Sequence, residues 1–579
     1  MASVTDTTWL IVEPDEDATA DRLTRSLEAL GVGCRRMDGA EACAALEASA
    51  GAPGRRLIAS SSAFLRFTDP QGGFRQDRWQ GAVHSAFVIP SDADSLAKVT
   101  DRIAGVGTIS IERARPGDEW EVCAEDHAFS LAMAGVRAPV SRSGESMFVL
   151  DAEMPGTDHI IAGRRGAGFI RCRFESVPIF VTSADVVDVG TILPAGIFDV
   201  REHFLSAVPI VLYVKWALAD QCWQAAETCA CLVIDDPLLK QRYGFLRFER
   251  LLTLMEELDF STSIAFIPIN WDRNSAATVG LFKQHATRFS LCVHGSDHTG
   301  GEFGDTDPAR MSWRVAQALE RMERLSGKTG LAYDPVMVFP QGVFSTAAMR
   351  ALKHSDFIGA VNTETISADE ESPPVTIADY WSVALMNYGE FPLFTRRYPS
   401  HGIQNIAFDI LLGKPCIIVV HHGDCRYGCR EVGAFITQVN SLRAPLRWTG
   451  LAELAQRSFR RRFGVNGVCE VEMFASKALI DNPTDHELRV VVRKRESDSG
   501  RISEVRANDA SCPWRWTDGE LSFETLLRPR ECRRLTVAFE KVDGSAYGGD
   551  SLRHRARAKF RRRLSEFRDN YLSGASYVS

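Results

Sequence analysis

The sequence predicts an α/β protein of several domains, and three observations support this prediction. The chain has 579 residues, more than one hydrophobic core usually contains. Between residues 226 and 465, short apolar segments alternate with amphipathic helical segments, which is typical of repeated β-α units. After residue 465 apolar and polar residues alternate between turn signals, as they do in antiparallel sheets. A central β/α region therefore has further domains on both sides.

The first 225 residues are expected to form α/β structure. Residues 1–140 alternate strand and helix patterns, such as "WLIVEP" followed by "DATADRLTRSLEALG", and predict a domain of the Rossmann or flavodoxin type. Residues 141–225 add short apolar strands, either as a second α/β segment or as a continuation of the first. Acidic residues after the first strand are similar to those of response-regulator receivers. However, "LIASSS" has serines where a phosphoacceptor Asp would stand, so we expect no phosphorelay.

Residues 226–465 have the most regular pattern. The segments "CLVIDD", "FSLCVHG" and "CIIVVHH" are strand candidates, and "FLRFERLLTLMEELD" places its apolar residues at three- and four-residue spacing on one helical face. Repeated units of this kind predict a parallel sheet, either a barrel or an open doubly wound sheet.

Two smaller units are expected at the carboxyl end. Residues 466–545 predict a small β-sandwich, and residues 546–579 predict a basic amphipathic helix. We expect this helix to dock on its own protein or on a partner, with contact to an anionic membrane surface as the alternative. Its expected apolar face consists of Leu552, Ala556, Phe560, Leu564, Phe567 and Tyr571.

Composition argues against several classes of partner and location. The net charge of -8 disfavours nucleic acid as a partner. The amino terminus has no signal-peptide pattern, and no apolar run reaches the roughly 18 residues of a membrane span, so we expect a cytoplasmic protein, peripheral to a membrane if the helix binds one. The 14 cysteines have no framework spacing and are expected to be reduced, with Cys425 and Cys429 as an alternative metal-binding pair. The oligomeric state does not follow from the sequence.

Ionisable side chains stand at three predicted strand ends of the central region. "CLVIDDP" ends in two aspartates, "LCVHGSDH" contains two histidines separated by three residues, and "CIIVVHHGD" ends in two histidines. The carboxyl ends of parallel strands converge on one edge, so residues far apart in sequence can share a site there. These candidate site residues are Asp235, Asp236, His294, His298, His421 and His422.

Their residue types favour a divalent metal. Adjacent carboxylates repel each other unless a cation or a proton offsets their charge. Two imidazoles with one carboxylate suit Zn²⁺ and similar ions, and they leave coordination positions open for water and substrate, as hydrolysis requires.

The order Asp-Asp, His-x-x-x-His, an aromatic-Pro loop and a strand-end His resembles the NodB-type polysaccharide deacetylases of carbohydrate esterase family 4, over roughly residues 230–463. The resemblance implies a distorted (β/α) barrel and hydrolysis of N-acetyl or other N-acyl groups on an amino-sugar glycan or glycan precursor. It also implies a divalent ion, Zn with Co, Ni, Mn or Fe as alternatives. The implied roles are catalytic base for Asp235, metal ligands for Asp236, His294 and His298, and general acid for His421 or His422.

The chain departs from the family pattern in three places. The family usually has an Arg two residues before the Pro of its third motif, but Val338 stands there, so another group must hold Asp235. Gln341 occupies a position where an aromatic often lines the groove, and "IADYWSV" is a loose form of the fourth motif. Strand alternation sends His421 and His422 to opposite sides, and we favour His421. The expected substrate contacts are Pro340, Gln341, Glu302 and Trp381.

Two other functions remain open at this stage. A glycoside hydrolase would need two carboxylates, Asp235 with Asp297 or Glu302, but it would leave the histidines unexplained. A catalytically altered barrel that binds a glycan and assists assembly is favoured by the missing Arg and by the large flanking domains.

Overall fold

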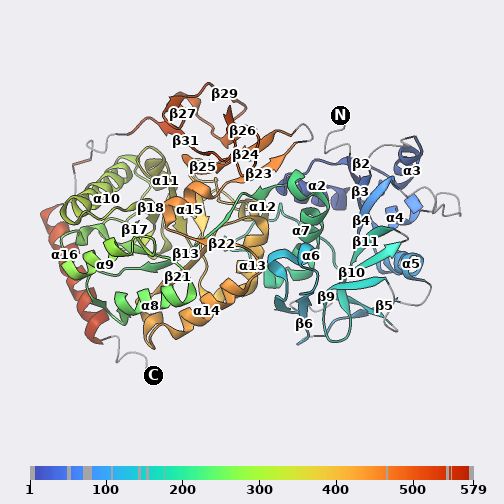
Figure 1. The fold of residues 1–579 in the computed structure, drawn as a ribbon, viewed down its shortest axis with the longest axis horizontal. Coiled ribbons are helices and arrows are strands. Elements are labelled where there is room, and N and C mark those ends of the chain that lie inside the picture. Colours follow the sequence, from blue (N-terminus) through green and yellow to red (C-terminus); the bar gives the residue numbers. More distant parts are fainter. Residues whose placement is uncertain are drawn as a thin grey trace.

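The computed structural model describes residues 7–48, 54–68, 81–105, 109–115, 117–140, 145–150, 156–174, 176–464, 467–542, 547–548 and 551–572. Three bodies lie side by side in it (Figure 1). An amino-terminal α/β part stands at one end, a β/α barrel at the other, and a β-sandwich packs along the barrel. The predicted fold class is therefore confirmed.

One mixed sheet contains the strands described in the first 182 residues. Its order is β2-β1-β3-β4-β11-β10-β9-β6-β7, with β8 beside β10 and β5 beside β8. The strands β1 to β4 and β11 pair in parallel, and the others pair antiparallel. The regions 1–140 and 141–225 thus share one sheet. The strands are β1 (Thr8–Ile11), β2 (Arg35–Met37), β3 (Arg55–Ser60), β4 (Val83–Ile89), β5 (Ile109–Arg113), β6 (Glu119–Val122), β7 (Arg137–Pro139), β8 (Ser146–Leu150), β9 (Thr157–Ala162), β10 (Ala167–Phe174) and β11 (Val177–Thr182).

The helix α7 (Phe204–Leu218) connects this part to the barrel. Its residues are apolar around most of the helix, as expected for a helix enclosed on all sides. Tyr213 stacks on Phe87, with ring centroids 5.1 Å apart, and donates a hydrogen bond to the carbonyl of Leu57. Among the described residues no helix combines the length and the apolar character needed to cross a membrane. The other helices of this part are α2 (Asp17–Ala29), α3 (Gly39–Ala48), α4 (Ser61–Thr68), α5 (Ala93–Ala104) and α6 (His127–Ser130).

The barrel is built on a parallel sheet of order β20-β19-β18-β17-β16-β13-β21, with β22 beside the start of β13. An isolated parallel bridge between Arg397 and Ile418 connects the chain after β20 to β21 and closes the ring. The barrel is distorted because one of its walls consists of this single bridge. The strands are β13 (Thr228–Asp235), β16 (Thr262–Phe266), β17 (Phe289–His294), β18 (Asp334–Val338), β19 (Gly359–Asn362), β20 (Leu393–Thr395), β21 (Cys416–His421) and β22 (Leu446–Trp448).

Helices cover the outer face of this sheet. The predicted apolar face of α8 (Phe248–Leu258) is buried there and contributes Leu251 and Met255 to the same core as Ile264 of β16. Alternate residues of the strands face the other way and pack with α15 (Leu451–Arg457). The two-residue side-chain period of the strands thus separates the two cores. The other helices are α9 (Ala276–Gln284), α10 (Pro308–Thr329), α11 (Thr346–Lys353), α12 (Ile377–Trp381), α13 (Ile403–Leu412) and α14 (Arg430–Ser441).

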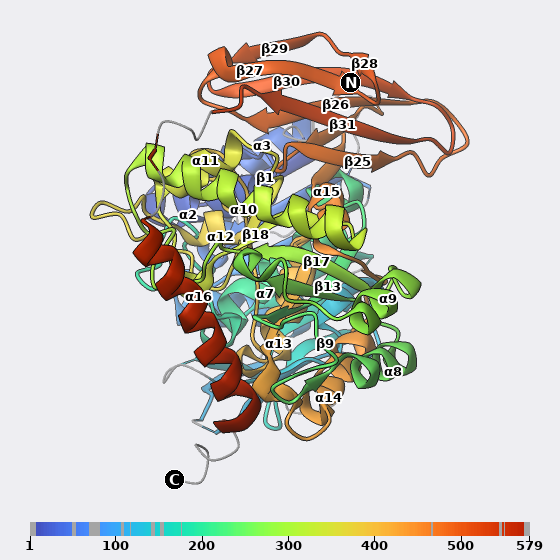
Figure 2. The ribbon, with the colours of Figure 1, turned by 90° about the vertical axis from the view of Figure 1, so that its left-hand side faces the viewer.

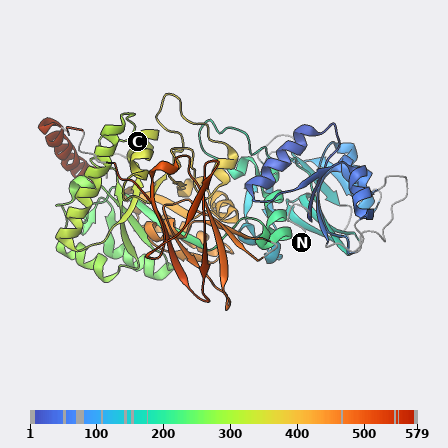
Figure 3. The same cartoon turned by 90° about the horizontal axis from the view of Figure 1, so that it is seen from above.

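The β-sandwich consists of a six-stranded and a four-stranded sheet that enclose an apolar core. It lies above the junction between the barrel and the amino-terminal part (Figure 3), and Arg460 donates to the carbonyl of Ala29 across that junction. The first sheet contains β12 (Gln224–Ala225), β23 (Arg460–Phe463), β24 (Cys469–Glu472), β26 (Leu488–Arg495), β30 (Glu520–Leu527) and β29 (Trp514–Thr517). The second contains β25 (Lys477–Asp481), β31 (Cys532–Phe539), β27 (Ile502–Ala507) and β28 (Ala510–Ser511).

The carboxyl-terminal helix α16 (Leu552–Phe567) lies along the barrel (Figure 2). Its contacts there are mostly polar, with Ala558 packed against Ile267 and Ile269. Glu566 forms ion pairs with Lys240 and Arg273. Asp569, just beyond the helix, accepts a 2.7 Å hydrogen bond from the hydroxyl of Tyr243. The sequence did not indicate which face would dock, and the apolar face points outward. The exposed fractions on that face are 63% for Phe560, 52% for Leu564, 54% for Phe567 and 73% for Tyr571.

We predict that a buried ion pair stabilises the closing wall of the barrel. Arg397 donates at 2.8 Å to Asp409 of α13, and the two side chains are only 3% and 6% exposed. Asp409→Ala would leave a buried arginine without its partner and should cost about 3–5 kcal/mol, measured as a lower midpoint in urea denaturation. Glu524→Ala breaks the exposed Arg489 pair and should cost less than about 1 kcal/mol. Equal losses for the two variants would contradict this reasoning.

Candidate active site

Three site residues lie on the same face at the carboxyl edge of the barrel sheet. Asp235 is the last residue of β13 and is in register with His421 of β21 and with Ala265 of β16. Ala265 is in register with Cys292, and His294 follows two residues later on β17. Register partners in a sheet point to the same side, as do residues two apart on a strand. Asp235, His294 and His421 therefore converge at the mouth of the barrel.

Asp236, His294 and His298 form a cluster with the geometry of a metal site. One ligand atom from each residue lies within 4.8 Å of the others. Asp236 Oδ1 is 3.2 Å from His298 Nε2 and 3.6 Å from His294 Nε2, and this buried oxygen has no hydrogen-bond partner. A buried carboxylate oxygen that faces two imidazole nitrogens is a donor set of the kind that holds a cation, so these residues fit a divalent ion.

The two imidazoles are prepared for that role in different ways. His294 Nδ1 is 3.0 Å from the carbonyl oxygen of Val338, so it donates its proton there and leaves Nε2 as the acceptor facing Asp236. Burial, followed by the neighbouring His294, lowers the pKa of His298 to about 4. The His298 ring is thereby kept in the neutral form that coordinates metals.

The backbone around the cluster adopts unfavourable conformations. Asp236 has φ = 81° and His298 has φ = 55°, both in the left-handed region that non-glycine residues rarely occupy. Gly295 has φ = 64°, and a Cβ atom at this position would collide with the Glu302 carboxylate and the Pro340 ring. Such strain is maintained only where surrounding contacts compensate for it, and it is concentrated at functional sites.

Glu302 supplies that compensation for the loop that carries His298. Its carboxylate accepts backbone N–H bonds from Ser296 at 2.9 Å, Asp297 at 3.0 Å and His298 at 2.9 Å. The side chain is buried and most of its acceptor capacity is used. Burial raises the pKa of Glu302. We expected a substrate contact here, and the structure instead gives Glu302 the task of shaping the loop.

A second set of contacts fixes the same loop to α10. Asp297 accepts a 2.9 Å hydrogen bond from Arg314, and both side chains are 1% exposed. Arg321 pairs with the other carboxylate oxygen of Asp297. Neither arginine is among the residues predicted from the sequence, although their spacing of seven residues places them on one face of α10 and is a usable signal.

Arg396 holds Asp235. Its two terminal nitrogens each lie 2.9 Å from a different carboxylate oxygen, and both side chains are 4% exposed. Burial alone would raise the pKa of Asp235, but Arg396, followed by His294, outweighs it and lowers that pKa to about 2. Arg396 thus does what the family arginine absent at Val338 would do. Its signal was available, because "LFTRRYPS" is another apolar strand that ends in charged residues.

His421 and His422 have different surroundings. The His421 ring stacks on Tyr398 at 6.1 Å, and its backbone N–H donates to Asp424. His422 meets the ring of Tyr243 edge-on at 5.3 Å, and its Nε2 lies 3.9 Å from an oxygen of Asp569. Burial lowers the pKa of His422, although Asp569 opposes the shift. Of the two, His421 shares the face of Asp235.

The remaining predicted contacts separate into three cases. Gln341 is exposed, has φ = 59°, and accepts the Gly301 N–H at 3.3 Å, so it lies opposite the His298 loop. Pro340 is buried. Trp381 does not fit the expected role, because it is 3% exposed and packs edge-on against Phe198 and Phe408. Its indole belongs to the apolar core, where it has no surface for a substrate.

The cysteine expectation needs one correction. Cys425 and Cys429 form a disulfide in the loop after His422, so this pair is neither reduced nor available to a metal. The other twelve cysteines are free thiols, among them the buried Cys231, Cys292 and Cys416.

Comparison with known proteins gives structural matches and no sequence matches. No protein-family model and no curated protein matches the chain. The solved carbohydrate deacetylase Agd3 matches 93% of this chain and 99% of its own, at 8% identity and a TM-score of 0.48. A putative polysaccharide deacetylase from Mycobacterium smegmatis matches 41% and 92%, at 17% identity and a TM-score of 0.28. A family 4 acetyl xylan esterase from Clostridium thermocellum, solved with cobalt, matches 39% and 90%, at 12% identity and a TM-score of 0.25.

We predict that the cluster binds one divalent ion per chain. His294→Ala combined with His298→Ala removes two of the three ligand side chains and should abolish binding, measured as metal content by mass spectrometry. His486→Ala removes an exposed imidazole of the β-sandwich and should keep the ion. Retention of metal in the double variant would refute the site assignment.

Proposed function

We propose that the chain is a metal-dependent hydrolase that removes N-acetyl or other N-acyl groups from an amino-sugar glycan or glycan precursor. One observation carries the proposal. The Asp236, His294 and His298 cluster lies beside a second carboxylate, Asp235, which Arg396 keeps ionised without occupying the cluster. Two adjacent carboxylates with separate tasks are what metal-assisted amide hydrolysis requires.

Zinc is the ion that we propose, because two imidazoles and one carboxylate are a common zinc donor set that leaves positions open. Cobalt, nickel, manganese and iron accept similar ligands. When bound, such an ion polarises the acyl oxygen and lowers the pKa of water. Asp236, His294 and His298 would hold it.

The protein's own groups then move the protons. Asp235 is ionised at neutral pH and lies next to the ligand Asp236, so it can take the proton of the attacking water. Arg396 orients that carboxylate through two hydrogen bonds. His421, on the neighbouring strand and the same face, is placed to give a proton to the departing amine. The base and the acid thus come from two strands that are directly paired.

The structure weakens both alternatives. A glycoside hydrolase needs a second carboxylate, yet Asp297 is 1% exposed and paired with two arginines, while Glu302 is bound to the loop backbone. The glycan-binding alternative drew support from the missing family arginine. Arg396 removes that support because it gives Asp235 an equivalent partner.

We predict that Asp235→Asn separates metal binding from turnover. The amide cannot accept the water proton, so acetate release from acetylated amino-sugar oligomers should fall by about 100-fold or more, with unchanged metal content. Asp485→Asn, an exposed change in the β-sandwich, should leave both unchanged. Loss of the ion in Asp235→Asn would mean that the roles of the two aspartates are exchanged. Full activity would end the assignment of Asp235 as the base.

We also propose that α16 rests on an anionic membrane surface. Its outward stripe of Phe560, Leu564 and Phe567 is more than half exposed, and the exposed Lys559 and Arg563 stand next to it. An apolar stripe flanked by cations is the arrangement of helices that lie in a lipid interface. The charge complementarity favours anionic lipid over a second copy of this acidic chain, whose net charge is -8.

We predict that the stripe determines binding to vesicles. The full chain should float with phosphatidylglycerol vesicles and not with phosphatidylcholine vesicles. Phe560→Ser with Leu564→Ser and Phe567→Ser should abolish flotation, because the buried apolar area is lost. Replacement of the exposed Leu526 in the β-sandwich by Ser should have no effect. Lack of flotation by the wild type would refute the proposal. A wild-type dimer that becomes monomeric in the triple variant would instead assign the stripe to contact with a second copy.

A further inference from the structure

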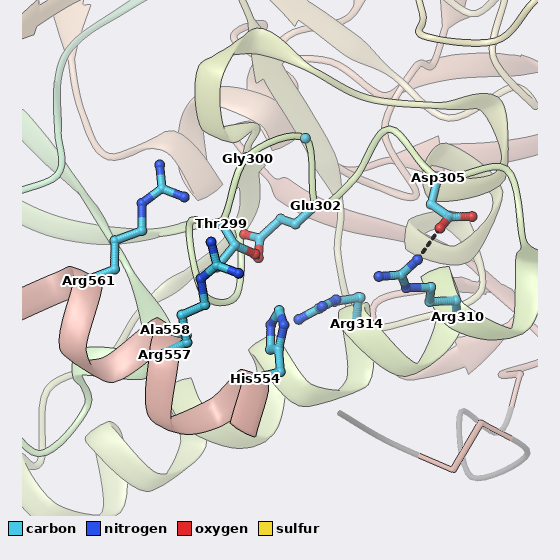
Figure 4. A pocket seen from close by; sticks show the side chains of 11 residues that line it. Thr299, Gly300, Glu302, Asp305, Arg310, Arg314, His554, Arg557, Ala558 and Arg561 are labelled. Carbon is cyan, nitrogen blue, oxygen red and sulfur yellow. Dashed lines mark hydrogen bonds and ion pairs between the residues drawn. The ribbon is translucent and has the colours of Figure 1, made fainter. Parts of the chain in front are cut away.

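A pocket of about 350 Å³ lies between the His298 loop and α16 (Figure 4). One wall is the loop directly after His298, beginning at Thr299, and the opposite wall is the helix. Five of its eleven lining residues are arginine or histidine. The lining consists of Thr299, Gly300, Gly301, Glu302, Asp305, Arg310, Arg314, His554, Arg557, Ala558 and Arg561.

The charges deeper in the pocket are already balanced. Arg310 forms an ion pair with Asp305, and Arg314 forms one with Asp297 behind the wall. His554 Nε2 is 3.5 Å from Asp297. Glu302 is 8% exposed, and its carboxylate accepts three backbone N–H groups. These residues therefore shape the pocket without giving it excess charge.

Two arginines of α16 are not balanced in this way. Arg557 and Arg561 are exposed, and the part of the chain that the structure describes gives neither of them an ion pair. They lie one helical turn apart on the same side of α16, and Figure 4 shows both side chains along the pocket wall, with Arg557 directed toward Thr299 and Glu302. Two guanidinium groups without carboxylate partners give this wall an excess of positive charge.

A third arginine extends the positive charge toward the cluster. Arg562 is 9% exposed, and its Nε is buried without a hydrogen-bond partner. Burial lowers its pKa, while the nearby Asp236 carboxylate acts in the opposite direction. An arginine this deeply buried normally pairs with an anion, whereas among the described residues Arg562 has only a weak 3.5 Å contact with Ser565.

We propose that this pocket binds an oxyanion group of the substrate, a sugar carboxylate or a phosphate ester. The inference rests on the proposed hydrolase function and adds the substrate class, namely an acidic glycan or glycan precursor. Guanidinium groups bind carboxylates and phosphates through paired, charge-assisted hydrogen bonds. Because Thr299 directly follows His298, an anion in the pocket would belong to the same molecule whose acyl group lies at the cluster.

The direct test measures anion binding by the metal-loaded full chain. Inorganic phosphate and glucuronate are titrated by calorimetry into the wild type, into Arg557→Gln with Arg561→Gln, and into Arg553→Gln with Arg555→Gln. The first double variant should weaken binding of at least one anion about tenfold or more, since it removes two charged donors. The second makes the same charge change on exposed positions of α16 outside the pocket and should not weaken it. Any phosphate bound at the metal site contributes equally in all three proteins. The difference in anion affinity between the two double variants therefore measures binding in the pocket.

The outcomes distinguish this inference from the function on which it rests. If the substrate group is a sugar carboxylate, the Arg557→Gln, Arg561→Gln variant should lose glucuronate binding. If the group is a phosphate ester, the same variant should lose phosphate binding. In turnover, the pocket variant should raise KM about tenfold for an acidic acetylated oligosaccharide relative to a neutral one of equal length, with kcat within about twofold. Equal binding by both double variants refutes the pocket, whether or not acetate is released. Selective loss of binding without acetate release from any substrate would keep the pocket and refute the hydrolase.

Discussion

The ion pair between Asp235 and Arg396 joins the segment that closes the barrel to the candidate site at the carboxyl edge of the sheet. Arg396 belongs to the segment that closes the barrel, and its neighbour Arg397 makes the closing bridge to β21 and pairs with Asp409. The two arginines point in opposite directions because the backbone is extended there. Each is almost fully buried and relies on its carboxylate as a hydrogen-bonded partner. Asp235 thus takes part in holding together the wall of the barrel that a single bridge closes.

The metal cluster depends on a different kind of constraint, one of backbone shape. His298 can face His294 only if the chain turns back within three residues, which requires the positive φ at Gly295 and at His298 itself. Glu302 satisfies three amides of that turn, and Asp297 fixes it to two arginines of α10. These two carboxylates keep the two imidazoles close to Asp236, the arrangement that a divalent ion would need.

The sequence predicted the cluster better than it predicted the residues that support it. Asp235, Asp236, His294 and His298 were predictable because apolar strand patterns are local and the convergence of strand ends is a general property of β/α folds. Arg396 stands at the end of a recognisable apolar segment, but its pairing with Asp235 was not predictable, because the two residues are 161 positions apart and no spacing encodes the contact. Trp381 was misplaced because a short motif carries residue types but not the direction of a side chain. The sheet shared by residues 1–140 and 141–225 depends on the pairing of β4 with β11, which local patterns do not reveal.

Helix α16 is a second case in which the sequence pattern gives the residues but not their contacts. A helical wheel gives the position of the apolar face but not what that face contacts, and the usual assumption is that it packs inward. Here the inward face is mostly polar because its neighbours are polar. Lys240 and Arg273 form ion pairs with Glu566, and Tyr243 donates a hydrogen bond to Asp569. Arg562 lies close enough to Asp236 for the two charges to interact. One helix therefore lines the site on one side and presents Phe560, Leu564 and Phe567 on the other. The helix is continuous, so a membrane that binds its outer face would also hold the pocket wall in place. Membrane binding and substrate binding would then depend on the same sixteen residues.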